Sequence, residues 1–234
     1  MRIGILIVST VIMLLSIFQA RAEESLPPLR DGNVPMNLDE LWDEDGVVIR
    51  YVTYTIGTFK GRTSTMSAFY AFPQGAKNLP AILHIHGGGQ RANLGQVKGA
   101  AWNGYAGLSV NWGGHPPLKL EKGEPNTDWG ALDPTQRSHN SHFRSMQPDD
   151  KTLDVVESPR NNNWFLIVLA CRRAITFLEQ QPEVDSDRIG VMGHSMGGKL
   201  TVDVAGIDPR IKAAVPSCGG SGSAPGAISG MPGS

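Results

Sequence analysis

The chain has 234 residues, a formal net charge of −1 and a mean hydropathy of −0.18. This length is enough for one domain with a sizeable core. The charged residues form no basic or acidic block, so we expect neither nucleic acid nor an anionic membrane surface as a partner.

Residues 1–22 have the pattern of a signal peptide. Arg2 provides a short basic start, residues 3–18 are apolar, and residues 20–22 read Ala-Arg-Ala, a small-x-small cleavage site. We expect cleavage after Ala22 and a secreted or periplasmic mature protein that is not held at a membrane. An uncleaved N-terminal anchor is the alternative, although the apolar stretch is shorter than the roughly 20 residues that span a bilayer.

Residues 23–45 are a lead-in rich in proline and acidic residues, and residues 46–234 are expected to form one α/β domain. Alternating β-branched and aromatic residues predict two antiparallel strands first. Strands that alternate with helices follow, which predicts a mostly parallel sheet with helices on both faces. The predicted strands are 47–57, 63–72, 81–85, 108–112, 189–192 and 213–217, and the predicted helices lie within 99–107, over 163–181 and from 196 onward.

A polar insertion at 113–159 interrupts this alternation. Loops of this length are usually functional or disordered, and this one leaves the carboxyl end of a strand, where α/β sheets bind ligands. Trp112 and Trp129 either contact substrate by stacking on sugar rings or anchor the insertion. His139 and His142 form His-x-x-His, but a solvated polar loop is favoured over a metal site, so we expect no metal.

The most informative motif is Gly193-His194-Ser195-Met196-Gly197, a G-x-S-x-G sequence between an apolar strand and an apolar helix. A serine in so sharp a turn takes a strained backbone conformation, and side chains two residues away would collide, so glycine is required there. Gly198 allows close packing of helix and strand. The motif predicts that Ser195 is a catalytic nucleophile; an inert serine in an ordinary turn is the alternative.

A second glycine motif, His86-Gly87-Gly88-Gly89, follows an apolar strand. Acyl transfer places negative charge on a carbonyl oxygen, which N–H groups fixed in advance stabilise. A glycine run lets backbone N–H groups approach that oxygen without interference from side chains. We predict an oxyanion hole formed by the N–H groups of Met196 and of Gly88 or Gly89, with His86 and Gly87 supporting the loop. A flexible glycine turn is the alternative.

The sequence at 187–198, Asp-Arg-Ile-Gly-Val-Met-Gly-His-Ser-Met-Gly-Gly, and the His-Gly-Gly-Gly strand end resemble those of α/β-hydrolases. More narrowly, residues 47–220 are similar to secreted bacterial esterases of the acetyl-xylan-esterase, dienelactone-hydrolase and prolyl-oligopeptidase-like group. The resemblance implies a serine carboxylic-ester hydrolase without a cofactor, acting on a small-molecule or carbohydrate ester, with an acylated carbohydrate as the leading substrate. A prolyl-oligopeptidase-like peptidase and a non-catalytic exported binding protein are the alternatives.

In this fold the acid and then the histidine of the triad follow the serine in sequence. No histidine follows Ser195, and the acids after it, Asp203 and Asp208, come too early. Three explanations stay open: a chain truncated before its last βα units, a triad that borrows a histidine from the insertion, and a binding relative without chemistry. Without its base the chain would be nearly inactive, because nucleophile and base act as a unit.

Export would permit a disulfide between the two cysteines, Cys171 and Cys218. Cys171 has core spacing on a predicted helix, and Cys218 ends a predicted strand. Two buried thiols that pack as small hydrophobic groups are therefore favoured over a disulfide.

Overall fold

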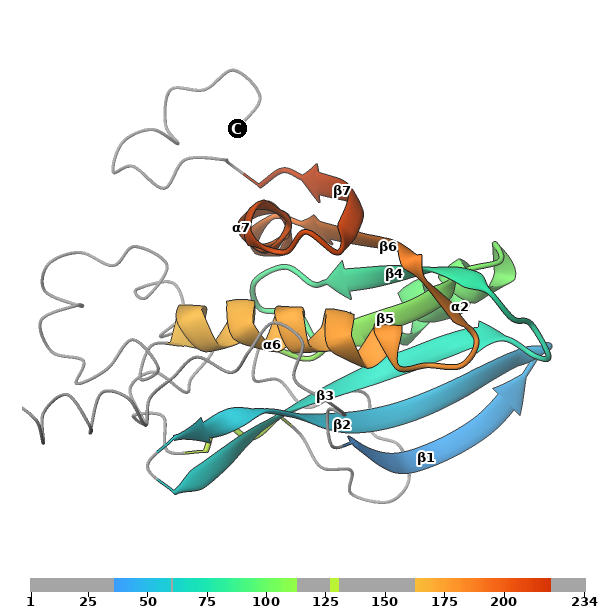
Figure 1. Ribbon diagram of the computed structural model, residues 1–234, viewed down its shortest axis with the longest axis horizontal. Helices are drawn as coiled ribbons and strands as arrows, with labels where there is room; N and C mark the ends of the chain where they lie inside the picture. The colour runs from blue at the N-terminus through green and yellow to red at the C-terminus, as the bar shows by residue number, and fades with distance from the viewer. Residues whose placement is uncertain (1–35, 60, 113–126, 131–162, 220–234) are drawn as a thin grey trace, which may run out of the picture. The chain divides into compact units, whose positions relative to one another are not determined.

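The computed structural model describes residues 36–59, 61–112, 127–130 and 163–219, all within the compact unit Gly32–Ser234. They form a seven-stranded sheet with the order β1-β2-β3-β5-β4-β6-β7 and three helices (Figure 1). The strands are β1 (Met36–Glu44), β2 (Val47–Phe59), β3 (Arg62–Pro73), β4 (Leu79–Ile85), β5 (Ala106–Val110), β6 (Val184–His194) and β7 (Ile211–Ser217). The helices are α2 (Leu94–Trp102), α6 (Asn163–Glu179) and α7 (Met196–Ile207).

The sheet is mixed, as the α/β prediction requires. Strands β5, β4, β6 and β7 are parallel, whereas β1, β2 and β3 are antiparallel and β3 pairs antiparallel with β5. The prediction of two N-terminal antiparallel strands was wrong by one, because β1 lies in what we expected to be a lead-in. Asp45 and Gly46, both with positive φ, form a two-residue hairpin turn between β1 and β2. An Asp-Gly pair is a strong hairpin signal.

Helix α2 begins earlier than predicted. The side chain of Asn93 accepts a hydrogen bond from the backbone N–H of Gln96 at 3.0 Å, which caps the first turn. The helix ends at Trp102, and Gly104, with a φ of 81°, turns the chain back into β5. The predicted range of 99–107 therefore placed the helix about one turn too late.

Helix α2 covers one face of the sheet, and helices α6 and α7 cover the other. Residues Ile49 and Tyr51 of β2 pack in a cluster with α2, whereas Val52 and Tyr54 face the cluster that contains α6 and α7. The Tyr54 hydroxyl donates to the backbone carbonyl of Ala170 in α6 at 3.0 Å. The period of two along β2 thus matches a sheet buried on both sides.

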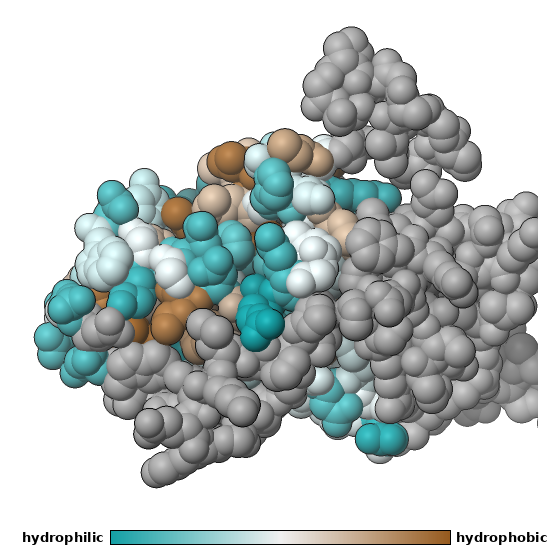
Figure 2. Space-filling view, turned by 180° about the vertical axis from the view of Figure 1, so that it is seen from behind, coloured by the Kyte–Doolittle hydropathy of each residue, from teal (hydrophilic) through white to brown (hydrophobic). Residues whose placement is uncertain are grey.

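Strand β7 lies at one edge of the sheet and is largely exposed. Its Val215 side chain is 60% exposed. Figure 2 shows the molecule from behind, and hydrophobic residues reach the surface near the top of this face, at the level where Figure 1 places β7. An edge strand with exposed apolar residues is a place where further polypeptide can pair.

A buried ionic cluster joins the ends of α6 and α7. The Asp208 carboxylate receives hydrogen bonds from Arg210, from Nη2 at 2.6 Å and from Nε at 2.8 Å, and lies 3.4 Å from Arg172 Nε. Arg210 also donates to Glu179 at 2.7 Å. Asp208, one of the two acids that follow Ser195, therefore has its carboxylate engaged by arginines in this buried cluster.

Asp208→Asn is expected to lower the free energy of unfolding by about 2–3 kcal/mol, because it leaves buried arginine charge poorly compensated. Burial alone would raise the pKa of Asp208, but the hydrogen bonds and charge of Arg210 outweigh it and hold that pKa below its usual value. The stabilisation is therefore present above about pH 4 and is lost as the pH falls through the lower folded-state pKa. Urea unfolding between pH 3 and 7 tests this; an unchanged stability of the variant would contradict it.

Candidate active site

Ser195 is the single residue between His194, where β6 ends, and Met196, where α7 begins. Its φ and ψ are 56° and −117°, a conformation that costs an L residue free energy. Its backbone N–H donates to the carbonyl of Ser217 in β7 at 2.8 Å. The Ser195 residue is exposed, and its hydroxyl makes no capping hydrogen bond to the helix. The turn therefore leaves the hydroxyl accessible.

Glycines make this turn possible. Gly193 pairs with Ile85 of the neighbouring strand β4. A Cβ at Gly197 would collide with the carbonyl oxygens of Ile85 and His86, and one at Gly193 would collide with Gly197. A Cβ at Gly198 would lie 2.5 Å from the Ser217 carbonyl oxygen. The first turn of α7 therefore packs directly on the backbone ends of β4 and β7.

The loop after β4 is fixed by His86 and Trp112. The His86 ring is buried, and its Nδ1 lies 2.7 Å from the Gly87 carbonyl oxygen. Trp112 stacks on this ring, with centroids 4.8 Å apart, and its Nε1 donates to the His86 carbonyl at 2.9 Å. A Cβ on Gly87 would lie 3.1 Å from the His194 carbonyl oxygen. The structure thus brings the two glycine motifs together at the carboxyl ends of β4 and β6.

Gln90 also holds this loop, and sequence reasoning missed it. Its side-chain Oε1 accepts from the Gly87 N–H at 3.0 Å, and its own N–H donates to the Gly87 carbonyl at 3.3 Å. The amide of Gly87 is therefore engaged, and Gly88 and Gly89 follow it in the loop.

Met196 provides the first amide of α7, which has no acceptor within the helix. A helix N-terminus favours negative charge.

Comparison with known proteins identifies the family. A family model described as acetyl xylan esterase (AXE1) matches residues 24–219, which is most of the chain. The chain belongs to the acetyl xylan esterase family. In sequence it is 39% identical to the acetyl esterase Axe7A of Xylanibacter ruminicola over 56 residues, 23% of this chain and 13% of that protein.

Solved members with α/β-hydrolase folds have a similar structure. The acetyl xylan esterase from Paenibacillus sp. R4 superposes with a TM-score of 0.54 and 24% identity, covering 85% of this chain and 57% of that one. Acetyl xylan esterase 1 from Thermoanaerobacterium sp. gives a TM-score of 0.57 and 20% identity, covering 76% and 50%. The predicted α/β-hydrolase fold is confirmed, and the chain spans about half the length of these esterases.

Trp112 and Trp129, for which the sequence left both substrate contact and anchoring of the insertion open, are buried. Trp112 is 1% exposed and Trp129 is 5% exposed, and both belong to the main hydrophobic cluster. The Ser64 hydroxyl donates to the Trp129 carbonyl at 2.9 Å. The geometry contradicts stacking on sugar rings and favours the anchoring alternative, because neither indole offers a free face.

The histidines of the described residues have hydrogen-bond partners other than Ser195. His84 Nδ1 lies 2.9 Å from Ser109 Oγ, His86 is held in its loop, and His194 Nδ1 lies 3.2 Å from Ser217 Oγ. Within the described ranges, no histidine is hydrogen-bonded to the Ser195 hydroxyl. The insertion histidines His115, His139 and His142 lie outside the described residues.

The two cysteines differ in burial. Cys171 is buried, and burial raises the pKa of its thiol. Cys218 is exposed, so the prediction of two buried thiols was wrong for this residue. Within the part of the chain that the structure describes, no group of three or more His, Cys, Asp or Glu residues is placed to hold a metal ion. No helix of that part is long and apolar enough to cross a membrane.

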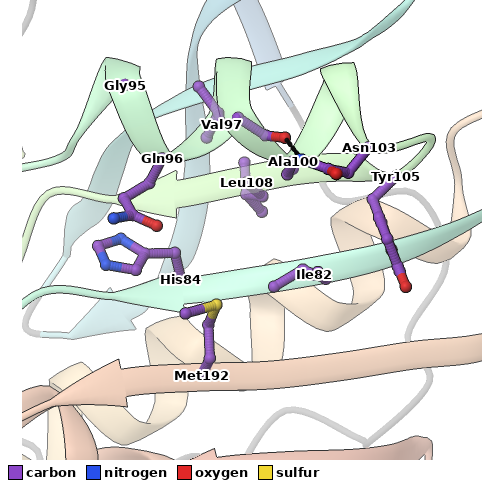
Figure 3. A pocket seen from close by; sticks show the side chains of 12 residues that line it. Ile82, His84, Gly95, Gln96, Val97, Ala100, Asn103, Tyr105, Leu108 and Met192 are labelled. Atoms are coloured by element: carbon purple, nitrogen blue, oxygen red, sulfur yellow. Dashed lines mark hydrogen bonds between the residues drawn. The ribbon is translucent and has the colours of Figure 1, made fainter.

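A cavity of about 350 Å³ lies between α2 and strands β4, β5 and β6 (Figure 3). His84 and Met192 form one wall, and Gln96 and Tyr105 contribute from the helix side. Ser109, which lies beside His84, also accepts from the Asn93 N–H at 2.9 Å. Ser195 does not line this cavity, and Ser109 links the His84 ring to Asn93, the residue that caps α2.

Burial lowers the pKa of His84 to about 4 from an ordinary value of 6.5. Between these values the unfolded chain binds more protons, so stability is expected to rise with pH across this window. His84→Gln should flatten the dependence, while Asn93→Ala, which removes a helix cap nearby, should lower stability without changing its slope. Urea unfolding at several values between about pH 4 and 7 measures both; an unchanged slope in His84→Gln would rule this out.

Proposed function

We propose that this chain carries the nucleophile and oxyanion groups of a secreted serine esterase that cleaves acyl groups from a carbohydrate, acetylated xylan being the leading substrate. One observation supports it above all: an exposed Ser195 with a φ of 56° beside the N-terminus of α7 and the glycine loop. Membership of the acetyl xylan esterase family and the acetyl esterase Axe7A among its relatives favour this substrate class. The apolar N-terminal segment supports export.

In the proposed reaction, Ser195 Oγ attacks the acyl carbon of the ester. Negative charge then develops on the carbonyl oxygen, where the N–H groups of Met196 and of Gly88 or Gly89 donate to it. The sugar hydroxyl leaves with a proton, and water releases the acyl group from the serine in a second step. A base must accept the hydroxyl proton, and we assign this part to a histidine outside the described residues.

A fluorophosphonate probe tests the nucleophile directly. Labelling of the folded protein that disappears in Ser195→Ala supports the proposal, whereas labelling retained in that variant removes Ser195 from its role. Acetylated xylan and a proline-containing peptide then separate an esterase from a peptidase. A folded protein that binds xylan without labelling or turnover would favour a binding protein of the same fold.

A further inference from the structure

The carboxyl end of β7 contacts the nucleophile turn through its backbone. Ser217 accepts the Ser195 N–H at 2.8 Å through its carbonyl, while its hydroxyl lies 3.2 Å from His194 Nδ1. A Cβ on Gly219 would overlap the carbonyl carbon of Gly198 and the nitrogen of Lys199. Because neither Gly219 in this segment nor Gly198 in α7 has a side chain, the segment can contact the first turn of α7.

Backbone strain is present on both sides of this contact. Ser195 and Cys218 both have positive φ, at 56° and 53°. Such conformations cost an L residue free energy and persist only where surrounding contacts over-determine them. The hydrogen bond to Ser217 at the end of β7 and the contact of Gly219, just after it, with Gly198 are contacts of this kind.

We propose that the segment Ser217–Gly219, the β7 end turn, is the positioning element that keeps Ser195 in its strained conformation. This inference rests on the proposed role of Ser195 as nucleophile. If the β7 end turn moves away, the Ser195 amide loses its acceptor and the residue relaxes. Its hydroxyl then leaves its place beside the amides of α7 and the glycine loop.

Gly219→Ala tests the proposal, with Gly206→Ala as a matched control. Gly206 lies in α7, and a Cβ there meets nothing within 4 Å. In Gly219→Ala we expect amide hydrogen exchange at Ser195 to accelerate about tenfold or more, with little change at Val191 in β6. We also expect the maximal rate of fluorophosphonate labelling to fall about tenfold at an unchanged half-saturating probe concentration. Gly206→Ala should change neither.

Equal protection of the Ser195 amide in Gly219→Ala and Gly206→Ala would overturn the proposal. Faster exchange in Gly219→Ala, in a protein that the probe never labels, would support the positioning role and count against Ser195 as nucleophile. If Gly219→Ala does not fold, Ser217→Ala tests the same element without adding atoms. It removes the hydroxyl that lies against His194 Nδ1 and leaves in place the carbonyl that accepts from Ser195. It should accelerate exchange at Ser195 about threefold, and Ser217→Thr should restore protection; unchanged exchange in Ser217→Ala would likewise overturn the proposal.

Discussion

Ser195→Gly is expected to raise the free energy of unfolding by about 1 kcal/mol while removing activity. The φ of 56° costs a serine of order 1–3 kcal/mol and costs glycine almost nothing. The greater freedom of glycine in the unfolded chain offsets roughly 0.5–1 kcal/mol of that gain. Since the serine side chain makes no capping bond to α7, its removal loses no such contact.

Ser195→Ala separates the two effects, because alanine keeps the strain but lacks the hydroxyl. Both variants should lose fluorophosphonate labelling, and both should lower any ester turnover of the wild-type protein by more than about 10⁴-fold. Only the glycine variant should unfold at a higher urea concentration than wild type. A glycine variant less stable than the alanine variant would show that the turn stores no strain.

The sequence predicts the candidate site better than it predicts the edges of the fold. The two glycine motifs specify their own backbone geometry, because Gly193 and Gly197 stand where a side chain would strike main-chain atoms. Such a local steric requirement can be inferred without knowledge of the rest of the chain. The strands that carry both motifs are short apolar runs, as expected of a parallel sheet, and they lie side by side.

The predictions were wrong or incomplete where a residue's role depends on particular side-chain contacts that no sequence pattern specifies. Trp112 follows a strand end, as a substrate-binding residue would, but its partner is the buried ring of His86, 26 residues earlier in the chain. Gln90 holds the glycine loop through a side-chain amide, for which no sequence pattern gives a signal. By contrast, β1 had a local signal in the Asp45-Gly46 pair, which an acidic composition obscured.

Gly197→Ala is expected to lower the free energy of unfolding by more than about 4 kcal/mol, enough to leave little folded protein. The added Cβ would strike the carbonyl oxygens of Ile85 and His86. Because these are backbone atoms at the end of the central strand β4 and just after it, the collision can be relieved only by moving α7 away from β4. Overpacking of flexible side chains, by comparison, costs typically 1–3 kcal/mol.

Gly206→Ala provides the comparison, since alanine there meets open space and is the better helix former by about 0.8–1.0 kcal/mol. Soluble yield, circular dichroism and urea unfolding of the two variants measure the difference; a folded Gly197→Ala protein of nearly normal stability would contradict the tight contact. The contact joins β4, which ends in the proposed oxyanion loop, to α7, which begins at the proposed nucleophile. The tight contact between α7 and the end of β4 therefore also sets the distance between Ser195 and the glycine loop. A variant that folds only by moving α7 away from β4 should lose fluorophosphonate labelling even where it keeps its helices.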